Sequence, residues 1–385
     1  KTKNNMNILY LATNRIYTNN TQQLFPLAIA SVAKVVFYGP GFNSEEILER
    51  GLNEFISKSS DKFDFIMTDG MVFFWDESKG TKAFNISYNY FSLNSLSKHL
   101  RDMKDFFIAY EDKKMLYTNI DFYNVTEEEV SLIKTSNTYL VSWGIELLDY
   151  KRNLNDLKNE LFFDKTNDNW INFIKGYTHK IISLPHIIAE TEFTFHPVNK
   201  RKFDITVPGV NYYNRKVINK IINKNKFKVN NRNSGYYQKL NIFLLRRYTT
   251  RSNLKIFNQI FNNTIEDSKI AYTCGSGLDY LIRKFFEIPA KGTLLACKPF
   301  KGFEEIGFID GENCLIVNSN NIVAKTEEIL NDTQSLNDIS RKGQKLVLEN
   351  HSFVARVKQI EESLKLILTN EFKGSYWSKG KYKHR

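Results

Sequence analysis

The chain lacks the features that mark secreted, disulfide-bonded and membrane-spanning proteins. Its 385 residues include only three cysteines, Cys274, Cys297 and Cys314, which form neither an even disulfide framework nor a CxxC metal pair. No apolar run reaches the roughly 18 residues that a bilayer-spanning helix needs, and no N-terminal segment has the layout of a signal peptide. We therefore expect a soluble protein of the reducing cytoplasm.

Several catalytic signatures are missing as well. The sequence contains no GxxxxGK[ST] loop, no HExxH helix and no GxSxG elbow, and no GxGxxG follows its first strand-like segment. These absences weaken interpretations as a nucleoside triphosphatase, a zinc protease or a serine hydrolase.

Hydrophobic residues make up 42% of the chain and aromatic residues 14%, which excludes wholesale disorder. Short apolar segments alternate with amphipathic ones, and this alternation predicts parallel sheets with helices on both faces. The predicted strands are 7–12, 34–38, 63–68, 106–110, 138–143, 180–184, 203–207, 269–273, 293–296 and 313–317. The predicted helices are 45–57, 127–135, 213–224, 279–288, 321–330 and 352–367.

A polar stretch divides this pattern near Pro197–Lys202, and the strands restart at Phe203. A chain of this length is comfortable for two domains that each bury a core. We expect one Rossmann-like domain over residues 1–198 and a second over 199–370. The last residues, 371–385, are rich in Lys and Arg, and we expect them to form a solvated, disordered basic tail.

The net charge of +12 is unevenly distributed. Between Ile205 and Ile265 there are twelve Lys and Arg residues and no acidic residue. Such a segment attracts polyanions, which include nucleic acid, an anionic membrane surface and phosphate-bearing ligands. Tyr212, Tyr213, Tyr236 and Tyr237 add aromatic rings that stack on bases, but no recognised nucleic-acid motif accompanies them.

Asp279, Arg283 and Glu287 stand four residues apart, and a helix over 279–288 would place all three on one face. Arg283 would supply a forked cation for a phosphate, and a carboxylate further along the helix would accept hydrogen bonds from ribose or sugar hydroxyls. On spacing alone, an exposed helix stabilised by two ion pairs explains the pattern equally well.

The segment Gly275-Ser276-Gly277 comes just before this predicted helix. The two glycines would let the backbone approach a phosphate closely, and the first turn of the helix offers unpaired N–H groups. Together with Arg283, these features suit a nucleotide-diphosphate sugar.

The segments 283–296 and 307–313 resemble the C-terminal half of a GT-B glycosyltransferase. The resemblance is strongest to group-1-like transferases related to the spore maturation (CgeB-like) proteins. It implies two Rossmann-like domains with parallel sheets facing across a cleft. In related retaining transferases, two acidic residues eight positions apart contact the transferred sugar and the ribose. The resemblance assigns these roles to Asp279, where the family usually has glutamate, and to Glu287.

Other segments resemble the same group. Phe203–Arg215 is similar to the first strand and loop of its nucleotide-binding domain, Val36–Phe42 to its N-terminal domain, and Ser352–Arg356 to its final helix. Gly209 turns the chain at the carboxyl end of a predicted strand, the usual ligand side of an α/β sheet. Arg215 opens the next predicted helix, where it would reach a diphosphate.

No DxD triplet, the metal-binding signature of the other large glycosyltransferase fold, occurs in the chain. A GT-B enzyme commonly uses cations and helix N-termini to neutralise the diphosphate leaving group. We therefore expect no metal and no cofactor besides the donor substrate. His186 ends a predicted strand near the expected cleft and is the candidate contact for the acceptor or the sugar, although a lone histidine is more often structural.

The sequence thus predicts a metal-independent glycosyltransferase of the hexosyltransferase type, and the family resemblance implies retention of configuration and a role in polysaccharide biosynthesis. The enzyme would transfer sugar from a nucleotide sugar to a glycan, glycolipid or glycoprotein. A nucleotide-sugar epimerase of the same fold and a non-catalytic polyanion-binding module stay open as alternatives. We expect no specific nucleic-acid partner. Peripheral contact of the basic residues with the inner membrane face also stays open.

Overall fold

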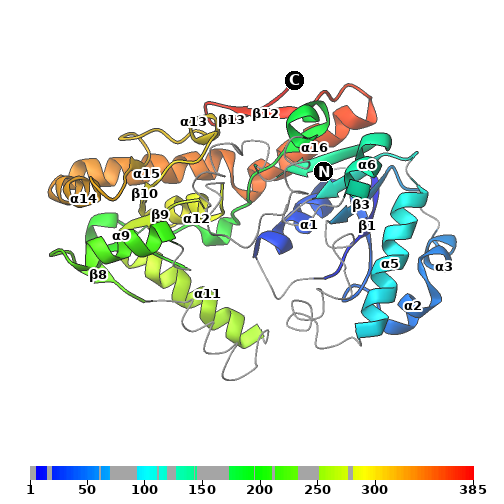
Figure 1. Cartoon of the computed structure of the whole chain (residues 1–385), viewed down its shortest axis with the longest axis horizontal. Coiled ribbons are helices and arrows are strands. Elements are labelled where there is room, and N and C mark those ends of the chain that lie inside the picture. Colours follow the sequence, from blue (N-terminus) through cyan, green and yellow to red (C-terminus); the bar gives the residue numbers. More distant parts are fainter. Residues whose placement is uncertain are drawn as a thin grey trace.

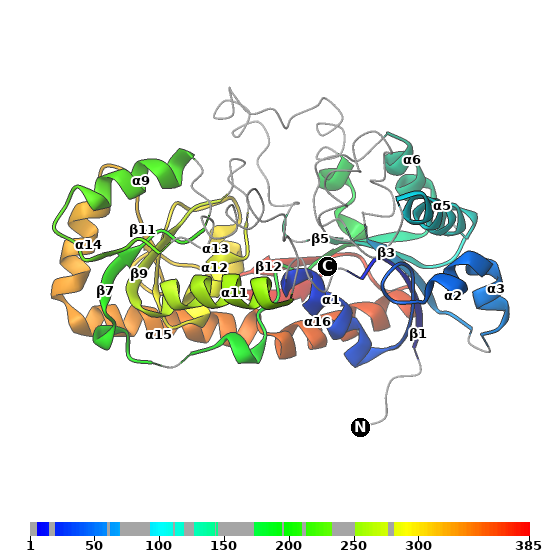
Figure 2. The same cartoon turned by 90° about the horizontal axis from the view of Figure 1, so that it is seen from below.

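The chain forms two lobes, each built on a parallel sheet, in the computed structural model shown in Figure 1 and Figure 2. The structure describes residues 6–14, 20–59, 62–69, 93–110, 112–118, 127–142, 144, 173–194, 196–209, 213–232, 251–275 and 281–385. None of the helices in these ranges is long and apolar enough to cross a membrane.

The first lobe contains a parallel sheet in the order β2-β1-β3-β4-β5-β6. Its strands are β1 (Asn7–Leu11), β2 (Lys34–Tyr38), β3 (Phe65–Asp69), β4 (Met115–Thr118), β5 (Thr138–Ser142) and β6 (Ile181–Ser183). Side chains alternate between the two faces of each strand. Along β1, Leu9 and Leu11 therefore belong to one hydrophobic core, and Ile8 and Tyr10 belong to the other.

Helices cover both faces of this sheet. They are α1 (Asn20–Val32), α2 (Glu45–Arg50), α3 (Leu52–Ser57), α5 (Leu93–Ala109) and α6 (Glu127–Thr135). The strand predicted over 106–110 is wrong, because these residues end α5. Phe107 lies on the same helical face as Leu100 and Met103, and all three are buried. The adjacent strand β4 has no counterpart in the prediction.

The second lobe contains a parallel sheet in the order β11-β10-β9-β7-β8. Its strands are β7 (Phe203–Thr206), β8 (Val229–Asn230), β9 (Ser268–Thr273), β10 (Leu294–Cys297) and β11 (Leu315–Ile316). Its helices are α9 (Tyr213–Asn223), α11 (Arg251–Glu266), α12 (Lys284–Ala290), α13 (Phe303–Ile306), α14 (Ile322–Asn331) and α15 (Thr333–Asn350). The chain runs from β7 outward to β8 and then returns past β7 to β9. The strand order therefore reverses between β7 and β9.

The helix predicted over 279–288 begins at Lys284 instead, and residues 279 and 280 lie outside the described ranges. Leu281 is buried against the first lobe, where a Cβ atom on Gly144 would come within 3.1 Å of its Cδ2 atom. Leu281 therefore packs against the first lobe just before the helix, a contact that the local sequence pattern does not show.

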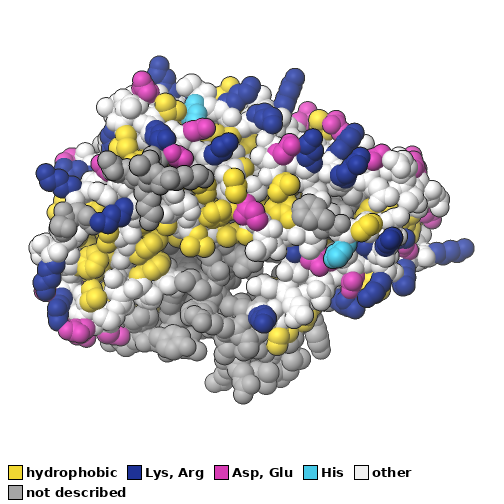
Figure 3. Space-filling model, turned by 180° about the vertical axis from the view of Figure 1, so that it is seen from behind, with side chains coloured by type: hydrophobic (Ala, Val, Ile, Leu, Met, Phe, Trp, Pro, Cys, Tyr) yellow, Lys and Arg dark blue, Asp and Glu magenta, His cyan; other side chains and the backbone are white. Residues whose placement is uncertain are grey.

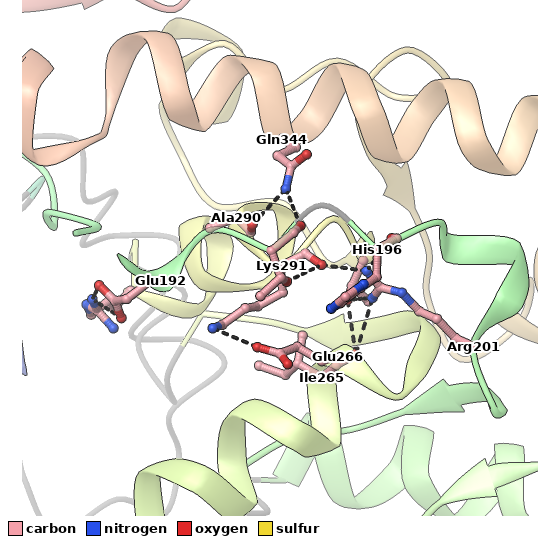
Figure 4. Close-up of polar contacts among 11 residues, drawn as sticks. Glu192, His196, Arg201, Ile265, Glu266, Ala290, Lys291 and Gln344 are labelled. Atoms are coloured by element: carbon pink, nitrogen blue, oxygen red, sulfur yellow. Dashed lines mark hydrogen bonds and ion pairs between the residues drawn. The ribbon is translucent and has the colours of Figure 1, made fainter. Parts of the chain in front are cut away.

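The segment between the lobes is fastened to the second lobe by Arg201, which is 8% exposed. Its guanidinium donates to the carbonyl oxygens of Ser268 at 3.1 Å and Lys291 at 2.5 Å (Figure 4). From α15, the Gln344 side chain donates to the carbonyl oxygen of Thr194 in the linker at 2.7 Å. It also donates to that of Ala290 at 2.8 Å (Figure 4). These contacts hold the linker against the second lobe.

The chain end returns to the first lobe. Helix α16 (Phe353–Leu368) packs along α1, and its buried residues join the core of the first sheet. Residues beyond it form an antiparallel hairpin of β12 (Ser375–Ser378) and β13 (Lys381–His384). Trp377 is 3% exposed and donates its indole N–H to the carbonyl oxygen of Ser183 at 2.9 Å. The expectation of a disordered tail is therefore wrong, because this aromatic side chain anchors the segment.

Candidate functional site

The carboxyl ends of β7 and β9 define the candidate site. In a parallel sheet, ligands bind outside the carboxyl ends of the strands, at the point where the strand order reverses. That point lies between β7 and β9 in the second lobe. Gly209 follows β7 with a φ of 91°, a left-handed conformation that favours glycine. Cys274 and Gly275 follow β9 and are buried.

Arg215 joins these two strand ends. It lies in the first turn of α9, and none of it is exposed. Its Nη2 atom donates to the carbonyl oxygen of Cys274 at 3.1 Å and to the Thr273 hydroxyl at 3.3 Å. These hydrogen bonds hold the guanidinium in place at the carboxyl ends of the two strands. The structure therefore brings Arg215, Gly209 and Gly275, all predicted donor residues, to one edge of the sheet.

Arg283 is bound differently, between two carboxylates. Its Nη2 atom lies 2.6 Å from Glu192 Oε2, and its Nη1 atom pairs with Glu287. It also donates to the carbonyl oxygen of Ile187 at 3.2 Å. Burial lowers the pKa of the guanidinium, but the carboxylates of Glu287 and Glu192 outweigh burial and raise it. Arg283 therefore connects α12 to the linker segment, and its predicted catalytic role stays a prediction.

We expect Arg283→Ala to destabilise the protein by about 3–5 kcal/mol, because it leaves two largely buried carboxylates without their cation. The side chain of Arg283 is only 10% exposed, and those of Glu192 and Glu287 are 16% and 17% exposed. Arg341→Ala removes the exposed pair with Asp338 and should cost at most about 1 kcal/mol. Thermal and urea unfolding measure both. Normal stability with lost turnover would instead place Arg283 at the diphosphate.

His186 follows β6 and lies where the lobes meet, beside the backbone of Leu281. Burial, followed by the charges of Arg283, Arg356 and Lys284, lowers the pKa of its imidazole to about 3. His186 is therefore neutral near pH 7, where it acts as a hydrogen-bonding group rather than as a cation. Its predicted contact with the acceptor or the sugar stays a prediction.

The depressed pKa of His186 predicts acid sensitivity. The folded state binds this proton only near pH 3, whereas the unfolded state binds it near 6.5, so stability falls as the pH drops below about 6.5. Between pH 6.5 and 4.5 the loss should be on the order of 2–3 kcal/mol. We expect His186→Gln to remove most of this loss in urea titrations across that range. The exposed His179 is the matched control, and His179→Gln should keep the wild-type slope.

Three predicted site residues, Ser276, Gly277 and Asp279, lie outside the described residues. Within the described ranges, no group of three His, Cys, Asp or Glu side chains comes together to hold a metal ion.

Sequence reasoning missed two residues of this region. Glu192 pairs with Arg283 although the two lie 91 positions apart, and no local pattern signals that contact. Lys284 lies beside Gly209 and Arg215. Its position next to Arg283 was visible in the sequence, but nothing there distinguished it from other basic residues.

A pocket of about 420 Å³ lies elsewhere, between the linker and α15. Gly292, in its lining, comes just before β10 and therefore at the amino ends of the strands. Gln334, Asn337 and Arg341 of α15 also line it. This pocket is on the opposite edge of the sheet from Gly209 and Gly275, so it does not belong to the candidate site.

Comparison with known proteins finds one matching family and several structures of similar fold. Residues 190–362 match the family described as glycosyl transferase-like. HepE from Anabaena, in complex with UDP-glucose, has a TM-score of 0.52 and 10% identity over 94% of this chain and 99% of that one. Sucrose-phosphate synthase from Thermosynechococcus elongatus has a TM-score of 0.53 and 11% identity over 95% and 100%. A glycosyltransferase from Rickettsia africae has a TM-score of 0.52 and 14% identity over 95% and 100%. No curated protein sequence matches the chain significantly.

The two parallel sheets and the similarity to these structures establish the GT-B fold, which confirms the predicted fold class. The chain is a glycosyltransferase, and its residues 190–362 carry the glycosyl transferase-like family sequence. The narrower resemblance to spore maturation proteins stays a prediction.

Proposed function

We propose that this glycosyltransferase takes its sugar from a nucleotide-diphosphate donor bound at the carboxyl ends of β7 and β9. The observation that carries the proposal is the burial of Arg215 at the reversal of strand order, where it is held by the carbonyl oxygen of Cys274 and the Thr273 hydroxyl. A buried guanidinium at this edge suits the two negative phosphates of such a donor.

The donor class is also supported by HepE, whose structure contains UDP-glucose and has the same fold. We propose a UDP-hexose as the first donor to test. The acceptor, a glycan, glycolipid or glycoprotein, would approach from the first lobe, where His186 lies beside Leu281 of the second.

The chemistry we propose is stabilisation of the departing diphosphate. As the bond between the sugar and the diphosphate breaks, negative charge grows on the leaving group, and preorganised cations in a site shielded from water stabilise it. Asp279 and Glu287 would contact the sugar and the ribose, and transfer with retention of configuration follows from the family resemblance. No metal ion enters this proposal.

A panel of UDP-, GDP-, ADP- and CMP-sugars tests the proposal by thermal stabilisation. A donor at 100 times its dissociation constant should add about 2.7 kcal/mol of stability. The stabilising donor is then incubated with radiolabelled sugar and candidate acceptors. Release of an isomerised sugar nucleotide without transfer would favour the epimerase, and absence of any stabilisation would contradict the proposal.

Salt dependence separates the donor site from polyanion binding. The exposed lysines of α9 and the following loop are Lys216, Lys220, Lys224, Lys226 and Lys228. A nucleic-acid site that used these five lysines and a sixth cation to neutralise about six phosphates would lose roughly a thousandfold in affinity between about 50 and 200 mM salt. On the face drawn in Figure 3, Lys and Arg side chains are spread over both lobes rather than gathered into one patch. We therefore expect weak, salt-sensitive binding of DNA and RNA.

Glu287→Gln should weaken binding of the nucleoside diphosphate by about 1.5–3 kcal/mol, because a carboxylate that accepts from ribose makes a charge-assisted hydrogen bond. Calorimetry with inorganic pyrophosphate is the control, since pyrophosphate has no ribose and should bind unchanged. Equal losses for both ligands would show that the variant acts through the pair between Glu287 and Arg283 rather than through ribose.

A further inference from the structure

Lys284, the first residue of α12, lies at the same strand edge as Arg215. A Cβ atom on Gly209 would stand 2.7 Å from Lys284 Cε, 3.0 Å from its Nζ and 3.8 Å from Arg215 Nη1. The ammonium and the guanidinium therefore both adjoin the backbone of Gly209, at the carboxyl end of β7. Glycine at this position leaves the room that both cations occupy.

The side chain of Lys284 is not neutralised in the way that Arg283 is. Among the described residues, no carboxylate forms an ion pair with it. Glu287 attracts it from the next turn, but that carboxylate is paired with Arg283. The Nζ atom also lies 5.8 Å from the ring centroid of Phe261. An aromatic face attracts a cation without cancelling its charge.

Two neighbouring cations at one buried edge repel each other. Burial, and then the charge of Arg215, lowers the pKa of Lys284 to about 8, while Glu287 and Cys274 raise it. A bound anion that touched both side chains would remove the repulsion and favour the charged ammonium. This end of the sheet therefore suits a ligand of negative charge.

We propose that Lys284, rather than the carboxylate-bound Arg283, is the cation that holds the donor's diphosphate together with Arg215. This inference rests on the proposed function and assigns its second phosphate-binding residue. Lys284 would donate to a phosphate oxygen and stabilise the diphosphate as it leaves. Arg283 then acts as a positioning residue that fixes the start of α12.

The proposal predicts proton uptake on binding. Above pH 8 most Lys284 side chains are neutral in the free protein, and the diphosphate charges them, so binding takes up most of one proton. The terminal phosphate of UDP titrates at about pH 6, well below this range, so proton uptake is measured with UDP, and pyrophosphate serves only to compare affinities. The other groups that face Lys284 are Arg215, Glu287 and Cys274, and Lys284 in turn acts on His186. Of these, the Cys274 thiol needs its own control.

The test is calorimetric titration of the full chain with UDP and with pyrophosphate, at pH 7.0 and 8.7, in two buffers of different ionisation enthalpy. In the wild type we expect proton uptake at pH 8.7 and little at 7.0. Lys284→Met should lose the uptake and bind both ligands about 10- to 100-fold more weakly. Lys284→Arg should keep most of the affinity without uptake, since arginine does not titrate in this range.

The matched control expected to behave as the wild type is Lys216→Met, which removes an exposed cation of α9. Cys274→Ser removes the thiol and is compared only for proton uptake with UDP at pH 8.7, which should persist. Wild-type affinity in Lys284→Met, or a loss for UDP but not for pyrophosphate, would overturn the assignment. If Lys284→Met does not fold, the absence of proton uptake in Lys284→Arg carries the test. If the wild-type protein binds no nucleoside diphosphate and no pyrophosphate, the proposed function itself fails.

Discussion

Arg215→Met should reduce turnover by a factor on the order of 10²–10³, the loss that follows removal of one preorganised group facing developing negative charge. Arg215 is fully buried and its guanidinium is fixed by Thr273 and Cys274, so its charge is in position before the donor arrives. No reorganisation is then required as the bond to the diphosphate breaks. The expected loss is in kcat as well as in affinity for the nucleoside diphosphate.

Steady-state kinetics with the donor found in the thermal panel measure this loss. Lys216→Met is the control, because Lys216 follows Arg215 in α9 but is exposed, and its removal should change turnover less than twofold. Circular dichroism checks that both variants fold. A folded Arg215→Met protein with normal turnover would exclude Arg215 from the active site and would contradict the proposed position of the diphosphate.

Arg356→Met should destabilise the protein by about 2–4 kcal/mol, because it leaves buried acceptors without their donor. Arg356 in α16 is fully buried. It donates to the carbonyl oxygen of Pro185 at 2.8 Å and to His351 Nδ1 at 2.9 Å, and it lies 5.1 Å from the ring centroid of Trp377. One side chain therefore ties the final helix and the hairpin to the end of β6, next to His186.

Urea unfolding at pH 7 measures the effect of this substitution. Lys358 lies two residues further along α16 and is exposed, so Lys358→Met should stay within about 0.5 kcal/mol of the wild type. Unchanged stability in Arg356→Met would mean that the apolar methionine compensates for the lost hydrogen bonds. The attachment of α16 and the hairpin to the end of β6 would then depend on Trp377 and the core of α16.

Several elements could be predicted from local pattern alone. The segments 34–38 and 127–135 were predicted with the observed bounds of β2 and α6, because apolar runs and amphipathic periods are local properties. The strand predicted over 106–110 fails for the opposite reason. Phe106 and Phe107 form a short apolar run that is typical of a strand, and only the longer period of α5 identifies a helix.

The candidate site likewise contains residues that local pattern identifies and contacts that depend on tertiary packing. Gly209, Arg215 and Gly275 are proposed from a strand, a turn and a helix start, and the parallel sheet brings them to the same end of its strands. The pair of Arg283 with Glu287 follows from the helical spacing, but its pair with Glu192 does not. Its pair with Glu192 joins residues 91 positions apart, so it depends on how the linker packs against α12.

The sequence by itself determined the class of this protein. The alternation of strands and helices and the short family motifs of residues 203–313 are local features of the chain, so they do not depend on how the side chains pack. Only the tertiary structure decided which cation lies at the carboxyl ends of β7 and β9. Arg283 and Lys284 are neighbours in the chain, and a helix start turns successive side chains in different directions. Arg283 then pairs with two carboxylates, and Lys284 lies beside Gly209 and Arg215. Charge alone does not separate them, since what each cation can bind depends on the groups that the fold packs around it.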